Sequence, residues 1–231
     1  SLHEALLFIA GLESDASRAE ALYRRVMSAG PSREAARAAL ELAKMEYARG
    51  EYRSALELLA AENGDLPSRA ADEAAYFRGL ALRQLGERMR SRTEFARVTR
   101  GELAGWSLVA QAEIEMEERR FERAIALFER AAKSQAHPVA RFGLGECYER
   151  SGETERALEQ YRAITRDLPR SLEAAKAAEK VTLLTRARES LSREKLPGGG
   201  ERGGWRSSAG SGMPSSDRYT IQFGAFGSRG N

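Results

Sequence analysis

Few side chains in this sequence could perform metal, acid–base or nucleophilic chemistry, and none has a partner at a useful spacing. The two histidines, His3 and His137, lie far apart, and neither has a His, Cys or acidic neighbour at metal-ligand spacing. The single cysteine, Cys147, lies beside the apolar Leu144 and Tyr148 with no base nearby, which is typical of a packed or half-exposed thiol. We therefore expect no enzyme activity, no cofactor and no metal.

Two further patterns also favour a structural interpretation over a chemical one. The glycine runs at 198–200 and 203–204 follow no predicted strand and lack the Lys-Ser/Thr pair of a phosphate-binding loop. The acidic series Glu113, Glu115, Glu117 and Glu118 is most simply the solvated face of a helix. The function of this chain therefore has to be inferred from its predicted helices and repeats and not from a catalytic motif.

Charge and hydropathy exclude two classes of partner for the body of the chain. The 231 residues carry a net charge of +3, but the segment from Thr185 onward contributes +4, which leaves the first 184 residues near −1. A near-neutral body argues against nucleic acid as the main partner. The apolar stretch at 6–10 is too short to cross a membrane and predicts a buried helix, so we expect no transmembrane segment.

Prolines divide the first 184 residues at a regular interval. They stand at Pro31, Pro67, Pro138 and Pro169, at separations close to one, two and one periods of about 34 residues. The segments between them are rich in Ala, Leu, Glu and Arg, so each period is long enough for two helices and their turns. A fixed period of this length predicts an all-α stacked solenoid.

Small and aromatic residues recur at fixed offsets inside each period. The pattern is clearest between Pro138 and Pro169, where its characteristic residues are Leu144, Gly145, Tyr148, Gly152, Ala157 and Tyr161. Weaker copies of the pattern precede this segment. This pattern resembles the tetratricopeptide repeat, which implies about five helix-turn-helix repeats over 1–170, starting near residues 1, 36, 72, 105 and 138. Small residues let two helices approach closely, and the aromatic fills the gap to the next helix. Residues 171–192 predict one further capping helix, and 193–216 a flexible linker rich in Gly and Ser.

The resemblance implies a concave groove, lined by the first helix of each repeat, that binds a protein or peptide. Carried over by register, its lining is Arg37, Lys44, Tyr47, Tyr76, Leu80, Arg83, Trp106, Val109, Glu113, Met116, Phe142, Glu146 and Glu149. Aromatic residues recur in four consecutive repeats, and the charges run from basic in the early repeats to acidic in the later ones. Alternatively, several aromatics pack between adjacent repeats, and the charges form an ordinary solvated face.

The last fifteen residues, 217–231, have a different pattern. Residues 219–223 (Tyr-Thr-Ile-Gln-Phe) alternate apolar and polar, which predicts a strand, and 224–228 (Gly-Ala-Phe-Gly-Ser) a small-residue exit. Together they resemble the first strand and turn of the SPOR domain, a small α+β domain that binds peptidoglycan stripped of its stem peptides. The resemblance implies a glycan-binding role for Gln222 in a completed domain, whereas Ala225 replaces a serine that often shares that role. Gln222 could equally be an ordinary outward-facing strand residue.

Two functions are consistent with these patterns. The first is a non-enzymatic adaptor of the bacterial cell envelope, in which the repeats recruit a protein and a completed SPOR domain holds it on peptidoglycan at division sites. That resemblance implies the periplasm, with an export signal or lipid anchor before Ser1. The second is a general protein-assembly scaffold, such as a chaperone-like or secretion-complex subunit, with a disordered tail.

Overall fold

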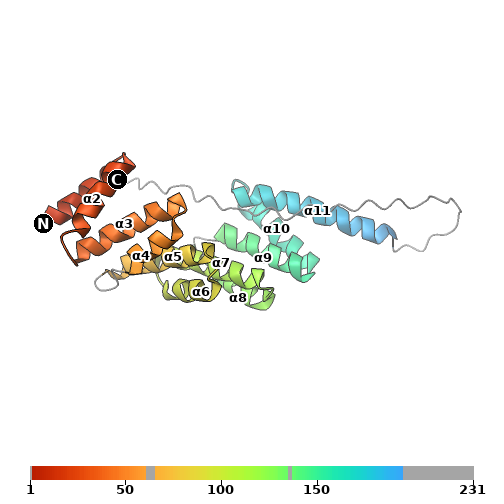
Figure 1. Cartoon of the computed structure of the whole chain (residues 1–231). Helices are drawn as coiled ribbons and strands as arrows, with labels where there is room; N and C mark the ends of the chain where they lie inside the picture. The colour runs from red at the N-terminus through yellow and green to blue at the C-terminus, as the bar shows by residue number, and fades with distance from the viewer. Residues whose placement is uncertain (1, 61–65, 135–136, 195–231) are drawn as a thin grey trace, which may run out of the picture.

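The computed structural model describes residues 2–60, 66–134 and 137–194, and in these ranges the chain is entirely helical apart from its turns. Figure 1 shows the helices stacked one after another into an elongated body. Within the described ranges none is long and apolar enough to cross a membrane. The first two residues of the predicted linker, 193–216, belong to the last helix; the rest of the linker and the predicted strand at 219–223 lie outside the described residues. The helices are α1 (Leu2–Leu12), α2 (Ala16–Met27), α3 (Arg33–Arg49), α4 (Tyr52–Ala60), α5 (Ser68–Gln84), α6 (Arg88–Arg97), α7 (Gly101–Glu117), α8 (Phe121–Ala131), α9 (His137–Ser151), α10 (Thr154–Asp167) and α11 (Leu172–Glu194).

Local signals in the sequence set the helix ends. The Asp15 carboxylate accepts hydrogen bonds from the backbone N–H groups of Ser17 and Arg18 at the start of α2, and the Ser32 hydroxyl accepts one from Ala35 N–H at the start of α3. Several first helices end in a left-handed residue, which reverses the chain into the second helix. This residue is glycine after α3, α5 and α9, but after α7 it is Arg119, with φ 60°.

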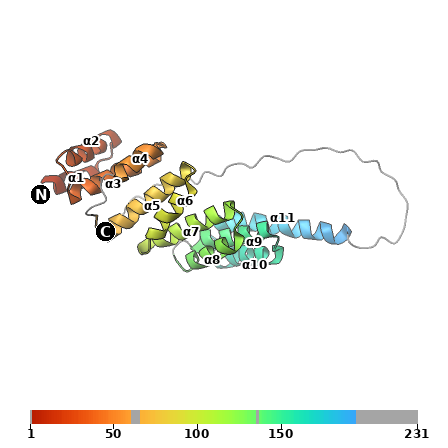
Figure 2. The ribbon, with the colours of Figure 1, turned by 60° about the horizontal axis from the view of Figure 1, so that its bottom comes forward.

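In the part of the chain that the structure describes, the helices form five pairs followed by α11, as the all-α tetratricopeptide solenoid predicts. Each helix packs mainly against its neighbours in the chain, and each first helix also contacts the first helices before and after it. Figure 2 shows α3, α5, α7 and α9 in chain order along the long axis. This succession of first helices is the element that positions the candidate site.

Small residues bring the two helices of a pair together, as the sequence pattern predicts. A Cβ added at Gly79 would lie 2.6 Å from the Phe95 ring, and one at Gly145 would overlap the ring of Tyr161. Ser91 stands where a small alanine is usual. It is fully buried, and its hydroxyl donates a hydrogen bond of 2.8 Å to the Gly79 carbonyl, so the extra oxygen is satisfied.

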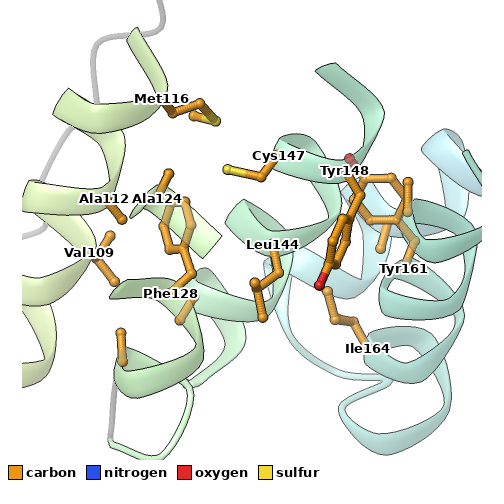
Figure 3. Close-up of a cluster of buried hydrophobic side chains, with 14 of the residues drawn as sticks. Val109, Ala112, Met116, Ala124, Phe128, Leu144, Cys147, Tyr148, Tyr161 and Ile164 are labelled. Atoms are coloured by element: carbon orange, nitrogen blue, oxygen red, sulfur yellow. The ribbon is translucent and has the colours of Figure 1, made fainter. Parts of the chain in front are cut away.

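Over the described ranges, the hydrophobic core is divided into four clusters along the axis. The largest extends from α7 to α11 and contains Phe128, Tyr161 and Cys147 (Figure 3). The other three lie over α1–α3, α3–α5 and α5–α7. A few half-buried side chains belong to two clusters each and link them, namely Leu58, Tyr47, Phe77 and Trp106.

Candidate partner-binding face

The thirteen predicted groove residues all lie on α3, α5, α7 and α9. We call the side of these helices that carries them, continued onto α11, the inner face. The structure sorts those residues by exposure. Arg37 is exposed, and four are buried: Tyr76, Leu80, Val109 and Met116. The remaining eight are half-buried: Lys44, Tyr47, Arg83, Trp106, Glu113, Phe142, Glu146 and Glu149.

The four buried residues correct the prediction that they line an open groove. Tyr76 and Leu80 belong to the core between α5 and α7, and Val109 and Met116 to the core that begins at α7. Their exposure is 5–8% in the structure, so they present little surface to a partner. The reason is that adjacent first helices contact each other, and their facing side chains fill the contact.

Most aromatic residues of this face pack against other aromatic rings, on the same face or on the second helices. The Tyr47 ring centroid lies 5.3 Å from that of Tyr52 and 5.9 Å from that of Phe77. The contact between Tyr47 and Phe77 joins the second and third repeats. Phe142 lies 5.4 Å from Tyr161, and Trp106 links two core clusters. The alternative expectation, that aromatics pack between repeats, therefore describes Tyr47 through its contact with Phe77, and Tyr76 through its place in the core between α5 and α7.

Ion pairs connect successive first helices across the inner face. The Lys44 ammonium contacts Glu73 of α5 and lies 5.7 Å from the centre of the Phe77 ring. Arg83 of α5 pairs with both Glu113 and Glu117 of α7, at 2.8 Å for Glu117. Two of the three basic residues predicted to line the groove, Lys44 and Arg83, are thus paired with acids of the next repeat.

A similar pair fixes the last helix to the array. Glu149 of α9 lies 3.0 Å from the Lys180 ammonium of α11 and accepts a hydrogen bond of 2.9 Å from the Tyr161 hydroxyl. Burial raises the pKa of Tyr161, and the neighbouring Glu149 carboxylate raises it further, so the hydroxyl stays protonated and donates. Sequence analysis did not identify Glu73 or Lys180. A usable signal exists, since the partners of Arg83 and Glu149 stand 30 to 34 residues further along, about one repeat.

Glu146 differs from the other charged residues of the inner face. It is half-buried, and within the described parts of the chain it makes no hydrogen bond or ion pair. Burial raises the pKa of its carboxyl group, the nearby Arg150 and Lys180 lower it, and Glu149 and Glu113 raise it again; the net shift is upward. Glu146 is therefore a carboxylate whose ionised form the free protein stabilises poorly.

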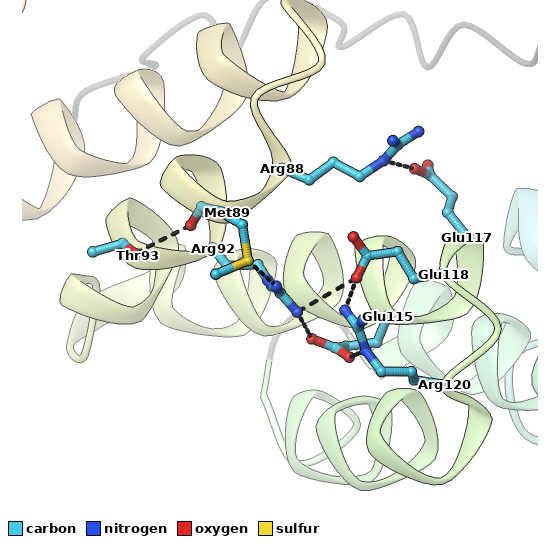
Figure 4. A network of polar contacts seen from close by, with 8 residues as sticks. All are labelled: Arg88, Met89, Arg92, Thr93, Glu115, Glu117, Glu118 and Arg120. Carbon is cyan, nitrogen blue, oxygen red and sulfur yellow. Dashed lines mark hydrogen bonds and ion pairs between the residues drawn. The ribbon is translucent and has the colours of Figure 1, made fainter.

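A second polar centre lies away from the inner face, at the junction of α6, α7 and α8 (Figure 4). Glu115 is only 6% exposed, so it departs from the solvated helix face that the acidic series predicted. Its two oxygens accept hydrogen bonds from Arg92 of α6 and from Arg120, and Arg120 also contacts Glu118. Burial alone would raise the pKa of Glu115, but these two guanidinium groups outweigh it and the net shift is downward.

The residues with catalytic or metal-binding side chains do not converge in the described part of the chain. Cys147 is fully buried, and burial raises the pKa of its thiol to about 12, so the reactive thiolate is scarce at neutral pH. The pKa of His137 is lowered by partial burial and by the Arg141 charge. No group of three or more His, Cys, Asp or Glu in the described ranges could hold a metal ion.

Helix order, packing and small-residue contacts define this protein as a tetratricopeptide-type α-solenoid. The tetratricopeptide repeat family matches residues 109–171, from the second half of α7 through α10. Among solved structures, MamA is similar with a TM-score of 0.55 at 19% identity, covering 77% of this chain and 91% of MamA. BtubC (BKLC) from P. vanneervenii has a TM-score of 0.54 at 16% identity, covering 94% of this chain and all of BtubC. At these identities the likeness shows the fold, and no curated protein sequence matches the chain.

Proposed function

We propose that this protein is a non-enzymatic scaffold that binds a protein partner on the inner face. The observation that carries the proposal is the continuous succession of first helices from α3 to α11, which presents half-buried charged and aromatic side chains on one side. A solenoid contributes this kind of extended surface to recognition, and large rigid side chains with partly buried charges give specificity.

The test compares two variants with the same change in charge. The inner-face variant combines Arg37→Glu with Arg150→Glu, and the outer-face variant combines Arg123→Glu of α8 with Arg162→Glu of α10; all four side chains are exposed. Proteins captured by the wild-type chain are purified, and the affinity of each for the wild type and for the two variants is measured by calorimetry. We expect the affinity for the inner-face variant to differ from that for the wild type, and the affinity for the outer-face variant to equal it. Equal affinity for all three chains would contradict the proposal.

We further propose the narrower role of a bacterial cell-envelope adaptor in the periplasm, working in division or wall remodelling. Its support is the pattern of residues 219–228, which lies outside both the described residues and the family match. A chain that continues through the rest of such a domain should pellet with sacculi stripped of stem peptides, whereas residues 1–194 should not. Loss of pelleting on Gln222→Ala would support the glycan role. If neither chain pellets, the general assembly scaffold is the better description.

A further inference from the structure

Among the described residues, the half-buried charged side chains of the inner face that were predicted to line the groove are paired across adjacent helices, with one exception. From α3 to α7, Lys44 contacts Glu73 and Arg83 contacts Glu113; between α9 and α11, Glu149 pairs with Lys180. Between these two sets, at the contact of α7 with α9, the side chain is Glu146. Within the described residues it has no cation as a direct partner.

The repeat geometry explains why the chain itself does not supply that cation. Glu146 stands 33 residues after Glu113, so the two occupy equivalent positions of adjacent first helices in contact. Arg150, one turn further along α9, is exposed and acts on Glu146 only through its charge, and Lys180 is held by Glu149. Burial disfavours the ionised carboxylate, and the more distant charges of Arg150 and Lys180 do not offset it, so the carboxylate is incompletely compensated in the free protein.

We propose that the partner places a lysine or arginine side chain against Glu146, and that this contact sets the position of the partner along the inner face. The inference rests on the proposed function. Phe142 lies one helical turn before Glu146 on the same helix and is half-buried, so its ring can flank the stem or head of the incoming cation. A partly desolvated carboxylate gains more from a cation than an exposed one does, which makes this contact a determinant of specificity.

The test uses random peptides displayed on phage and selected on the full chain, because the natural partner is not needed for it. Each selected peptide is synthesised, and its affinity is measured for the wild type, Glu146→Gln, the inner-face variant and Glu159→Gln. Glu159 is an exposed residue of α10 and serves as the matched control. We expect peptides with a Lys or Arg whose replacement by Gln lowers affinity for the wild type about tenfold or more. The same replacement should change affinity for Glu146→Gln little.

The possible results separate this inference from the proposed function. Peptides that respond to the inner-face variant but bind Glu146→Gln as tightly as the wild type would overturn the inference and leave the scaffold proposal standing. Peptides indifferent to the inner-face variant, or the absence of any selected peptide, would overturn both. Thermal melting of Glu146→Gln checks its folding, and a midpoint at or above the wild-type value is expected because an uncompensated charge is removed.

Discussion

Arg92 Nη1 of α6 lies 2.5 Å from Glu115 Oε1 of α7, so an ion pair with a buried carboxylate joins the third repeat to the fourth. Glu115 stands 33 residues before Tyr148, which is buried at the equivalent position of the next repeat. The array therefore uses an aromatic packing contact at one junction and charge-assisted hydrogen bonds at another.

This pair should be worth a measurable part of the stability. Arg92→Ala leaves the buried Glu115 with Arg120 alone, and we expect it to lower the free energy of unfolding by about 1–3 kcal/mol. Arg90→Ala, which removes an exposed pair with Glu87, should cost at most about 0.5 kcal/mol. Urea denaturation of both variants makes the comparison, and equal losses would show that Arg92 contributes no more than a surface residue.

Two glutamates should affect the pH dependence of stability in opposite directions. The folded-state pKa of Glu115 lies below the ordinary value of 4.5, so its contribution is present above that pH and is lost as pH falls through the folded value. The folded-state pKa of Glu146 lies above 4.5, so its ionisation costs stability as pH rises through the folded value. At neutral pH, Glu115→Gln should be less stable than the wild type, and Glu146→Gln equally or more stable. Denaturation between pH 3 and 7 should show both differences shrinking in acid.

The fit of glycine against aromatic rings should be sensitive to a single methyl group. A Cβ at Gly145 would overlap the ring of Tyr161, and we expect Gly145→Ala to cost about 1–3 kcal/mol. Gly11 of α1 has no atom within 4 Å of an added Cβ, so Gly11→Ala should be neutral or stabilise by up to about 1 kcal/mol through helix propensity. In thermal melts, the midpoint of Gly145→Ala should therefore fall below that of the wild type, whereas the midpoint of Gly11→Ala should stay equal or rise.

The buried thiol should react only when the chain opens. Because burial raises the pKa of Cys147 to about 12 and its side chain is inaccessible, we expect iodoacetamide to label the native protein very slowly at pH 8. Labelling should become rapid in guanidinium chloride, where the thiol recovers an ordinary pKa. Mass spectrometry measures both rates, and fast labelling of the native chain would argue against the packing of α9.

The periodic part of the fold is accessible from sequence because each cue acts locally. Pro31, Pro67, Pro138 and Pro169 interrupt helices wherever they stand, and the small residues at helix crossings repeat at the same offset. The exact boundaries are less accessible, because the sequence predicts repeats starting near residues 1, 36, 72, 105 and 138, whereas the first helices begin at residues 2, 33, 68, 101 and 137.

The site was harder to predict because exposure depends on neighbours that a single repeat does not reveal. Tyr76 and Val109 have the right register for a groove, yet the adjacent first helix covers them. Charge pairing depends on which long side chain reaches across, so Lys44 with Glu73 could not be distinguished from a solvated pair. The burial of Glu115 had no signal of its own, since its charge is compensated by arginines from two other parts of the chain.

The division of the core into four clusters has a mechanical consequence. The clusters share only a few half-buried side chains, such as Leu58 and Trp106. We call the junctions between neighbouring clusters seams, and we expect the body to be less stiff there than within a cluster. Bending and local opening should concentrate at those seams, where little apolar surface has to separate. A partner that binds across such a junction would restrict bending there. The curvature of the array would then change when the partner binds.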